Sequence, residues 1–196
     1  MRKLIFAALL AGGATLAATP ALAQDSAPFS GVRVQGIAGY DRVNTDGEHS
    51  NGVAYGAQVG YDFQAGGLVL GVEGEAGDSS VDDCATGVIV ATDELCANAG
   101  RDLYVGGRVG YAVSPRVLLY GKAGYTNSRL SLDYEDGTAA TAPDFSISEN
   151  LDGVRVGGGV EFAVGRNAFL STEYRYTNYE QGVDRHQVVA GFGFRF

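Results

Sequence analysis

The sequence predicts an all-β fold, a transmembrane β-barrel of eight antiparallel strands joined as an up-and-down meander. Segments of about ten residues with alternating apolar and polar side chains recur along the chain, as they do in the strands of such barrels. Short connections between these segments alternate with longer polar ones, and aromatic residues gather near the segment ends. The eight expected strands are 29–41, 52–63, 68–77, 102–112, 117–127, 153–163, 168–178 and 186–196.

The alternation is clearest in the second expected strand. Every second residue from Val53 to Phe63 is apolar, whereas the residues between them are small or polar. Side chains point alternately to the two faces of a strand, so one face of this strand is apolar and the other is not. The last expected strand repeats the pattern, with Phe192, Phe194 and Phe196 on its apolar face. The alternation identifies strands, but it does not decide which face is turned to water.

The polar faces of the expected strands carry charges of both signs. In a soluble sandwich or a lipocalin-like barrel these charges would face water, whereas in a membrane barrel they would face the lumen. The expected lumen charge network consists of Arg33, Glu73, Glu75, Arg108, Lys122, Arg155, Glu161, Glu173, Arg175 and Arg195. Buried charges are tolerated when they are paired, so we expect a structural network, with an ion-conducting path as the alternative. The sequence does not specify which charges pair.

The lengths of the connections favour the membrane barrel over the soluble alternatives. Three connections are short, at 64–67, 113–116 and 164–167, and four are longer and polar, at 42–51, 78–101, 128–152 and 179–185. Short periplasmic turns and longer outer loops are typical of outer-membrane barrels. Eight strands enclose an interior that side chains can fill, which argues against a general porin.

The first 23 residues have the features of a secretory signal peptide. Arg2 and Lys3 precede an apolar run, and Ala21-Leu22-Ala23 forms a small-residue cleavage site. We therefore expect residues 1–23 to be removed and residues 24–196 to form one barrel domain. The formal net charge of −9 becomes −11 without Arg2 and Lys3. Such acidity argues against a nucleic-acid partner, because phosphates are bound by lysine and arginine.

The two cysteines, Cys84 and Cys96, lie in the expected loop 78–101. Because the chain is expected to be exported to an oxidising compartment, we expect these cysteines to form a disulfide. A zinc site is not expected, because no histidine lies near the two cysteines in the sequence. The expected outer loops are acidic, yet their spacing matches no calcium-binding loop, which leaves weak divalent bridging to lipopolysaccharide as the alternative to a solvated anionic surface. No metal or cofactor is therefore predicted.

Three stretches resemble a known family: 120–125 (YGKAGY), 156–162 (VGGGVEF) and 170–176 (LSTEYRY). They are similar to the outer membrane protein β-barrel domain family, the OmpA-like and opacity-type proteins often labelled porin-family or immunogenic. The resemblance implies a place in the outer membrane of a Gram-negative bacterium, among lipid and lipopolysaccharide. It also implies that the terminal aromatics Phe192, Phe194 and Phe196 form the signal read by the barrel-assembly machinery, although they could simply face lipid.

Catalysis is not expected from this sequence. Lipid A deacylases of the eight-stranded type use a His-x-Ser-Asn arrangement, whereas His186 is followed by Gln187, Val188 and Val189. Two function classes remain: a structural and surface-exposed scaffold of the cell envelope, or a surface adhesin or ligand-binding protein. In the second class the loops 78–101 and 128–152 would carry the binding, because rigid scaffolds often present function on loops. A narrow ion-conducting pore ranks third.

Overall fold

The computed structural model describes residues 27–45, 48–86, 94–135 and 145–196. The expected signal peptide, residues 1–23, lies outside this part of the chain. The strands are β1 (Gly31–Thr45), β2 (Glu48–Ala65), β3 (Leu68–Ser79), β4 (Asp82–Thr86), β5 (Glu94–Ser114), β6 (Val117–Glu135), β7 (Phe145–Val164), β8 (Ala168–Tyr179) and β9 (Val183–Arg195). A single 3₁₀ turn, η1 (Glu180–Gly182), joins β8 to β9. No helix in the described part of the chain is long and apolar enough to cross a membrane.

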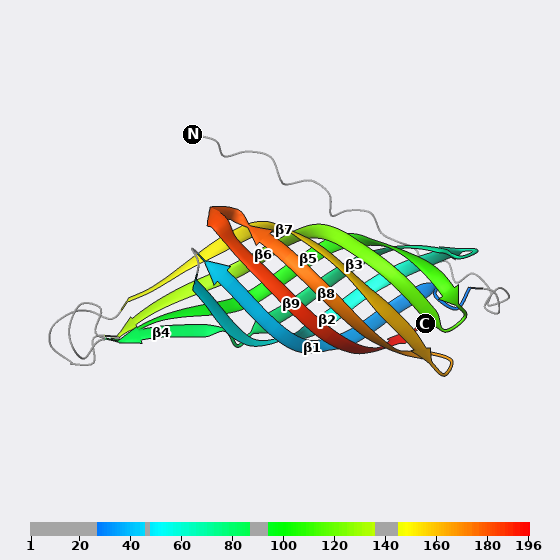
Figure 1. The fold of residues 1–196 in the computed structure, drawn as a ribbon, viewed down its shortest axis with the longest axis horizontal. Helices are drawn as coiled ribbons and strands as arrows, with labels where there is room; N and C mark the ends of the chain where they lie inside the picture. Colours follow the sequence, from blue (N-terminus) through cyan, green and yellow to red (C-terminus); the bar gives the residue numbers. More distant parts are fainter. Residues whose placement is uncertain (1–26, 46–47, 87–93, 136–144) are drawn as a thin grey trace, which may run out of the picture.

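Eight of these strands close into a barrel in which every paired neighbour is antiparallel (Figure 1). The first and last strands, β1 and β9, pair along their lengths, and β3 pairs with β5 to complete the circle. Val32 and Phe196 exchange two backbone hydrogen bonds, of 3.1 and 2.8 Å, at the seam. Closure matters because lipid offers no hydrogen-bond partner to an open sheet edge. The predicted eight-stranded meander is confirmed.

All eight barrel strands are longer than the sequence predicted, β5, β6 and β7 by the largest margins, and a further short strand joins them. The expected loop 78–101 contains β4 and the start of β5, and the expected loop 128–152 contains the end of β6 and the start of β7. In these stretches the alternation changes face: the outward apolar positions of β6 are odd-numbered up to Tyr125, whereas the apolar positions are even-numbered from Leu130 to Tyr134. The pattern of the barrel strand therefore ends before the strand does. Together 82–86, 94–101, 128–135 and 145–152 form a four-stranded sheet, here called the projecting sheet, which extends from one end of the barrel (Figure 1).

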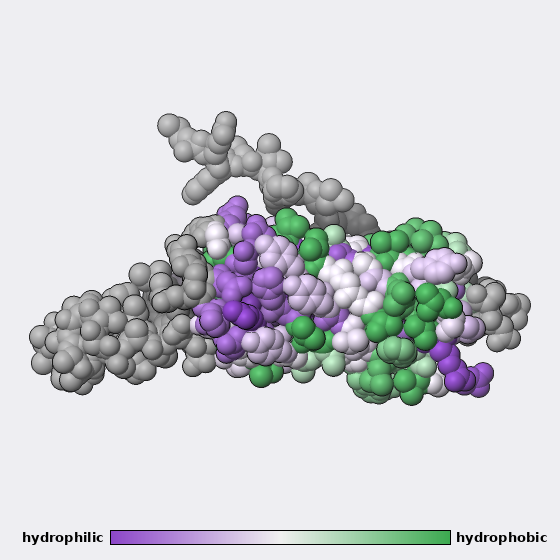
Figure 2. Space-filling model, viewed as in Figure 1, coloured by the Kyte–Doolittle hydropathy of each residue, from purple (hydrophilic) through white to green (hydrophobic). Residues whose placement is uncertain are grey.

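The two faces of the barrel wall are opposite to those of a soluble protein. Large apolar side chains point outward, with Val72 65% exposed and Val105 61% exposed, whereas Arg33 and Arg155 are fully buried inside. The outward surface is apolar toward the short-turn end and becomes hydrophilic toward the rim that carries the projecting sheet (Figure 2). In a soluble barrel the apolar side chains would pack together inside. Here they face outward, where lipid covers them. Only a small cluster of Phe29, Val69 and Leu118 forms a buried apolar core among the described residues.

Glycines at the inner wall make room for large side chains in the narrow lumen. The ring of Tyr104 lies against Gly106 and Gly124, and a Cβ added at Gly124 would lie 2.8 Å from a carbon of that ring. At the short-turn end, Gly66 and Gly165 have φ values of 61° and 80°, which favour glycine in a tight turn. The inner-wall glycines leave space for the large side chains of the lumen, and the turn glycines allow the tight connections between strands.

Candidate functional site: the charged lumen and the outer rim

Fourteen charged side chains are buried inside the described part of the barrel. They include all ten members of the expected lumen charge network, together with Asp41, Asp62, Asp102 and Arg185. Seven of the fourteen are acidic and seven are basic, so their formal charges cancel. The basic members are Arg33, Arg108, Lys122, Arg155, Arg175, Arg185 and Arg195. We call this set the lumen column, because its ion pairs run from one end of the barrel to the other.

The end of the lumen column near the short turns is centred on Asp62. Its carboxylate lies 3.3 Å from Arg33, 3.2 Å from Arg108 and 2.9 Å from Arg195. Glu161 bridges the last two cations, at 3.0 Å from each. These five side chains come from five different strands, so they connect distant parts of the wall across the lumen. Arg33 also pairs with Glu73, which links this end to the middle of the column.

Lys122 occupies the middle of the lumen column. Its Nζ atom lies 2.9 Å from Glu73, 2.9 Å from Glu173 and 3.7 Å from Glu75. Arg175 completes the group, because it pairs with Glu75 at 2.6 Å and also with Glu173. A single ammonium group therefore stands among three carboxylates, two of which also bind a guanidinium of Arg175.

The outer end of the lumen column is built on Asp102 and Asp41. Arg155 pairs with Glu75 at 3.2 Å and with Asp102, and so continues the column outward. Arg185 lies 3.1 Å from Asp102 and donates from Nε to Asp41 at 2.9 Å. The column thus reaches the outer rim without a break. Each of its seven carboxylates has a cation within 3.1 Å, which offsets the high desolvation cost of burying it.

Four members of the lumen column were missed in the sequence. Arg185 is a correction: it was expected in the outer loop 179–185, where it would have offset the acidic residues, but the structure buries it in the lumen. Asp41, Asp102 and Asp62 belong to the expected strands but were not included in the network. All four lie on the polar face of their strand by parity. Applying the alternation to every residue of the expected strands would have found the three aspartates, and extending the last strand by one residue would have found Arg185.

The tripeptide Tyr-Thr-Asn occurs twice at the outer rim, at 125–127 and 176–178. In each copy the tyrosine hydroxyl and the asparagine amide donate to an aspartate of the next strand, Asp152 or Asp184, and the amide bonds are 2.7 and 2.8 Å long. Both aspartates lie at the outer rim, near the residues where the pairing of the barrel strands ends, and these hydrogen bonds lower the pKa of each below its ordinary value. The threonine between them points inward to the lumen column, at Asp102 or Arg155. The repeat therefore connects the outward face of the rim to the inner ion pairs.

The backbone register places Cys84 directly opposite Cys96 on the adjacent strands β4 and β5. Direct cross-strand partners bring their Cβ atoms to within about 4.5–5.5 Å, close to the span of a disulfide. We propose that the two cysteines are joined and that the bond fixes the edge of the projecting sheet.

Alkylation in denaturant tests this disulfide. Without reductant, neither cysteine is expected to react, and the closed loop is expected to restrict the unfolded chain by roughly 3 kcal/mol in the chain-entropy model. Intact mass after alkylation gives the answer directly, with a reduced sample as the control. Addition of two alkyl groups without reductant would show that the thiols are free.

A family model for the outer membrane protein beta-barrel domain matches residues 6–196. The chain belongs to this family. The 22 kDa outer membrane protein of Rhizobium leguminosarum bv. viciae is 32% identical over 175 residues, which cover 82% of this chain and 75% of that protein. The 31 kDa outer-membrane immunogenic protein of Brucella melitensis biotype 1 is 29% identical over 166 residues, or 75% of this chain and 68% of that protein.

Solved structures agree on the fold. Neisserial surface protein A matches with a TM-score of 0.60 at 20% identity, over 85% of this chain and 98% of that one. Ail, the attachment invasion locus protein of Yersinia pestis, matches with a TM-score of 0.57 at 16% identity, over 85% and 99%. Family membership and the barrel together place the protein in the outer membrane of a Gram-negative bacterium, in contact with lipid and lipopolysaccharide. Within the ranges that the structure describes, no group of His, Cys, Asp or Glu is arranged to hold a metal ion.

Proposed function

We propose that the protein is a structural and surface-exposed scaffold of the outer membrane, without enzymatic activity. The observation that carries this proposal is the lumen column, in which seven acidic and seven basic side chains neutralise one another through the length of the barrel. An enzyme of the acid–base type needs a carboxylate or histidine that is free to exchange a proton with a substrate. The buried carboxylates here are engaged by cations, which favours a role in holding the barrel closed.

A second candidate function, binding of a surface ligand, is favoured by the projecting sheet. Within the described residues, β4 pairs only with β5, and the stretch 145–152 of β7 pairs only with β6, so each outermost strand has an open edge. Open edges can accept an extended segment of another chain as an added strand. Because the lumen column is neutral, the net negative charge of the mature chain lies outside the lumen, and it selects for a basic partner. An anionic ligand such as the heparin analogue bound to Ail would be disfavoured.

Complementation of a deletion strain separates the two functions. One version is intact, and in the other the residues 80–100 and 129–150 are replaced by short turns, which removes the projecting sheet but keeps the barrel register. Heat-modifiable gel mobility verifies folding, and detergent and antibiotic sensitivity report on the envelope. The scaffold proposal predicts full restoration by the trimmed barrel. A trimmed barrel that folds but does not restore resistance to detergent and antibiotics would contradict the scaffold proposal and would show that the projecting sheet carries the function.

A third version serves as the matched control for charge. It keeps the projecting sheet but neutralises six of its acids, by substituting Asn or Gln at Asp82, Asp83, Glu94, Asp133, Glu135 and Glu149. If the trimmed version loses a phenotype that the charge-neutralised version retains, the strand edges carry the binding. If the trimmed and the neutralised versions both lose the phenotype, the acidic charge carries the binding.

The outward terminal aromatics are proposed to be the signal for the barrel-assembly machinery. Phe192 and Phe194 form an edge-to-face pair with ring centroids 5.2 Å apart, and Phe196 is 69% exposed at the end of the seam. Phe196→Ser is expected to lower the amount of assembled barrel in cells several-fold. Phe162→Ser, which removes a similarly outward phenylalanine from β7, is the control. Equal losses in both variants would mean that these side chains act only as lipid contacts.

A further inference from the structure

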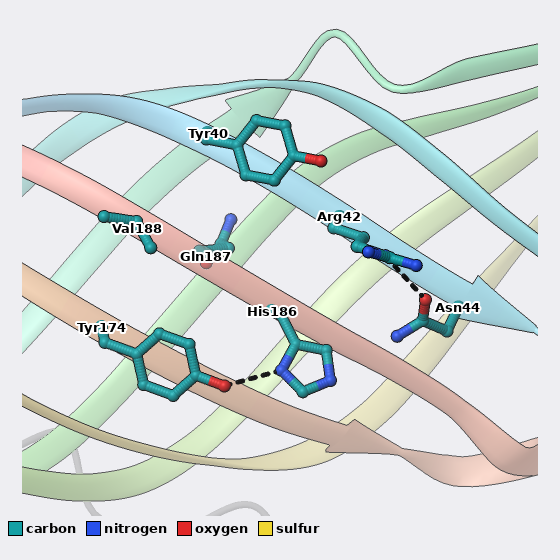
Figure 3. Close-up of a pocket in the computed structure, with 7 residues that line it drawn as sticks. All are labelled: Tyr40, Arg42, Asn44, Tyr174, His186, Gln187 and Val188. Atoms are coloured by element: carbon teal, nitrogen blue, oxygen red, sulfur yellow. Dashed lines mark hydrogen bonds between the residues drawn. The ribbon is translucent and has the colours of Figure 1, made fainter.

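A pocket of about 340 Å³ lies on the outward face of the barrel near the outer rim, where β1, β8 and β9 run side by side (Figure 3). We call it the rim pocket. Its lining includes Tyr40, Arg42 and Asn44 of β1, Tyr174 of β8, and His186 and Val188 of β9. It lies on the outside of the wall, so it belongs neither to the lumen column nor to the projecting sheet. Its role is therefore independent of the proposed function.

The rim pocket gathers positive or protonatable groups on a protein whose outside is acidic. Arg42 and His186 are direct cross-strand partners, and they have the same outward orientation. His49, the other histidine of the chain, is the cross-strand partner of Asn44 on β2, so both histidines lie in this area. The Arg42 guanidinium donates from Nε to Asn44 at 3.2 Å, and no carboxylate of the described residues pairs with it. The Arg42 side chain is exposed and lines the pocket.

His186 is held in a fixed orientation by two tyrosines. The Tyr174 hydroxyl lies 2.8 Å from Nδ1, and the Tyr176 ring lies 5.1 Å from the imidazole, measured between centroids. When Tyr174 donates to Nδ1, the proton of a neutral imidazole is on Nε2, so that atom becomes a donor on the side of the ring away from Tyr174 (Figure 3). The neighbouring Asp184 already accepts hydrogen bonds from Tyr176 and Asn178, at 2.7 and 2.8 Å.

The rim pocket lies at the level along the barrel axis where the headgroups of the outer leaflet are expected. Tyr40, Tyr174 and Val188 are each 51% exposed on the outward face, and Val188 continues into the apolar surface below. On the other side of the pocket, Asn44, Asn178 and Asp184 mark the polar rim. Tyrosines occupy this border in membrane proteins because their rings are apolar and their hydroxyls are polar. A group bound here would have its charge at Arg42 and its acyl chains along the outward wall.

We propose that the rim pocket binds the phosphate-bearing headgroup of an outer-leaflet lipid, with Arg42 and His186 as paired donors. The guanidinium presents a planar set of N–H groups that suits a phosphate, and the imidazole adds a second donor from the adjacent strand. Tyr40 and Tyr174 flank the site at the border between the apolar wall and the polar rim, a position that suits a lipid headgroup. The partner is thus a lipid of the membrane in which the barrel stands.

Native mass spectrometry of the folded full chain in detergent tests the proposal. The probes are lipid A with two phosphates, the same lipid A after removal of its phosphates, and phosphatidylcholine, whose single phosphate is compensated by the positive charge of choline. Retention of the phosphorylated form is expected to exceed that of the other two, and the double variant Arg42→Gln/His186→Gln is expected to lower it about tenfold. Arg42→Lys, which keeps the charge, is expected to retain part of the binding. Heat-modifiable mobility verifies that each variant folds.

The control removes two exposed cations at the opposite rim, Arg116→Gln/Arg166→Gln, and is expected to leave retention unchanged. Equal retention of phosphorylated and dephosphorylated lipid A by the unaltered protein would overturn the proposal. An equal loss in the control variant would also overturn it, because binding would then follow total charge. Inorganic phosphate provides the last arm: if it displaces the lipid at equal concentration, the site binds free phosphate and the assignment to a lipid is wrong.

Discussion

Replacing Lys122 with methionine is expected to lower the free energy of unfolding of the barrel by about 3–5 kcal/mol, the usual effect of removing one partner from a buried ion pair. The methionine fits the space of the lysine stem, so the loss is mainly electrostatic. Glu73 and Glu173, each 2.9 Å from the ammonium group, would be left with one cation fewer in the middle of the lumen column. The column would then carry a net charge of −1 in a site shielded from water.

Urea unfolding of the barrel in lipid vesicles measures this loss. The chain contains no tryptophan, so tyrosine fluorescence or heat-modifiable mobility must follow the transition. The double variant Lys122→Met/Glu173→Gln restores neutrality and is expected to recover part of the stability. Arg116→Met removes an exposed cation at a short turn and is expected to change the stability by no more than about 0.5 kcal/mol. If Lys122→Met and Arg116→Met unfolded at the same urea concentration, the lumen column would have no stabilising role.

Hollowing the lumen column is expected to convert a closed barrel into a conducting one. In planar bilayers the unaltered protein is expected to show no steady conductance, because the side chains of the column fill the narrow interior of an eight-stranded barrel. The variant replaces two acids and two bases of the middle region with serine, at Glu75, Lys122, Glu173 and Arg175, so that each remaining member of the column keeps an oppositely charged partner. The formal charge stays at zero, so repulsion among the remaining charges does not complicate the comparison. A steady single-channel conductance is expected for this variant.

The smaller variant Arg155→Ser/Glu75→Ser provides a second measurement if the fourfold variant does not fold. These two side chains form an ion pair of 3.2 Å, and their joint removal also keeps the column neutral. Its conductance is expected to lie between those of the unaltered and fourfold variants. A steady conductance in the unaltered protein, with no increase in either variant, would contradict the closed lumen and favour the ion-conducting alternative.

The sequence is most informative where lipid covers one face of a strand and the packed lumen covers the other. In β2 and β9 the alternation separated the two faces, because Val59 or Phe194 differs in polarity from Gln58 or Arg195. The connection lengths then predicted that the apolar face is the outward one. The ten charges expected in the lumen are buried there for the same reason. The ion pairs themselves could not be read from the sequence, since partners such as Arg155 and Asp102 meet across the lumen and depend on the tilt and register of all eight strands.

The projecting sheet and the rim pocket depend on information that alternation does not contain. Beyond the membrane, water can reach both faces of a strand, and β4 has no polarity pattern to distinguish it from loop. In the outer part of β7 the alternation of Phe145 and Ile147 with serines has the opposite parity to the barrel part, so it does not continue the pattern of the predicted strand. Cross-strand hydrogen bonds alone extend the sheet there. The rim pocket was missed because Arg42 and His186 lie 144 positions apart and become neighbours only when the barrel closes between β1 and β9.

Labelling of single cysteines in intact cells tests most directly whether the barrel presents the projecting sheet on the cell surface. Both native cysteines are first replaced by serine, and one new site is added, either Ser148→Cys on the projecting sheet or Arg116→Cys at a short turn. Both positions are exposed in the structure. With a membrane-impermeant maleimide, the Ser148→Cys variant should be labelled in intact cells and the Arg116→Cys variant only after the outer membrane is permeabilised. Labelling of Arg116→Cys in intact cells, with Ser148→Cys protected, would contradict this orientation and the account built on it.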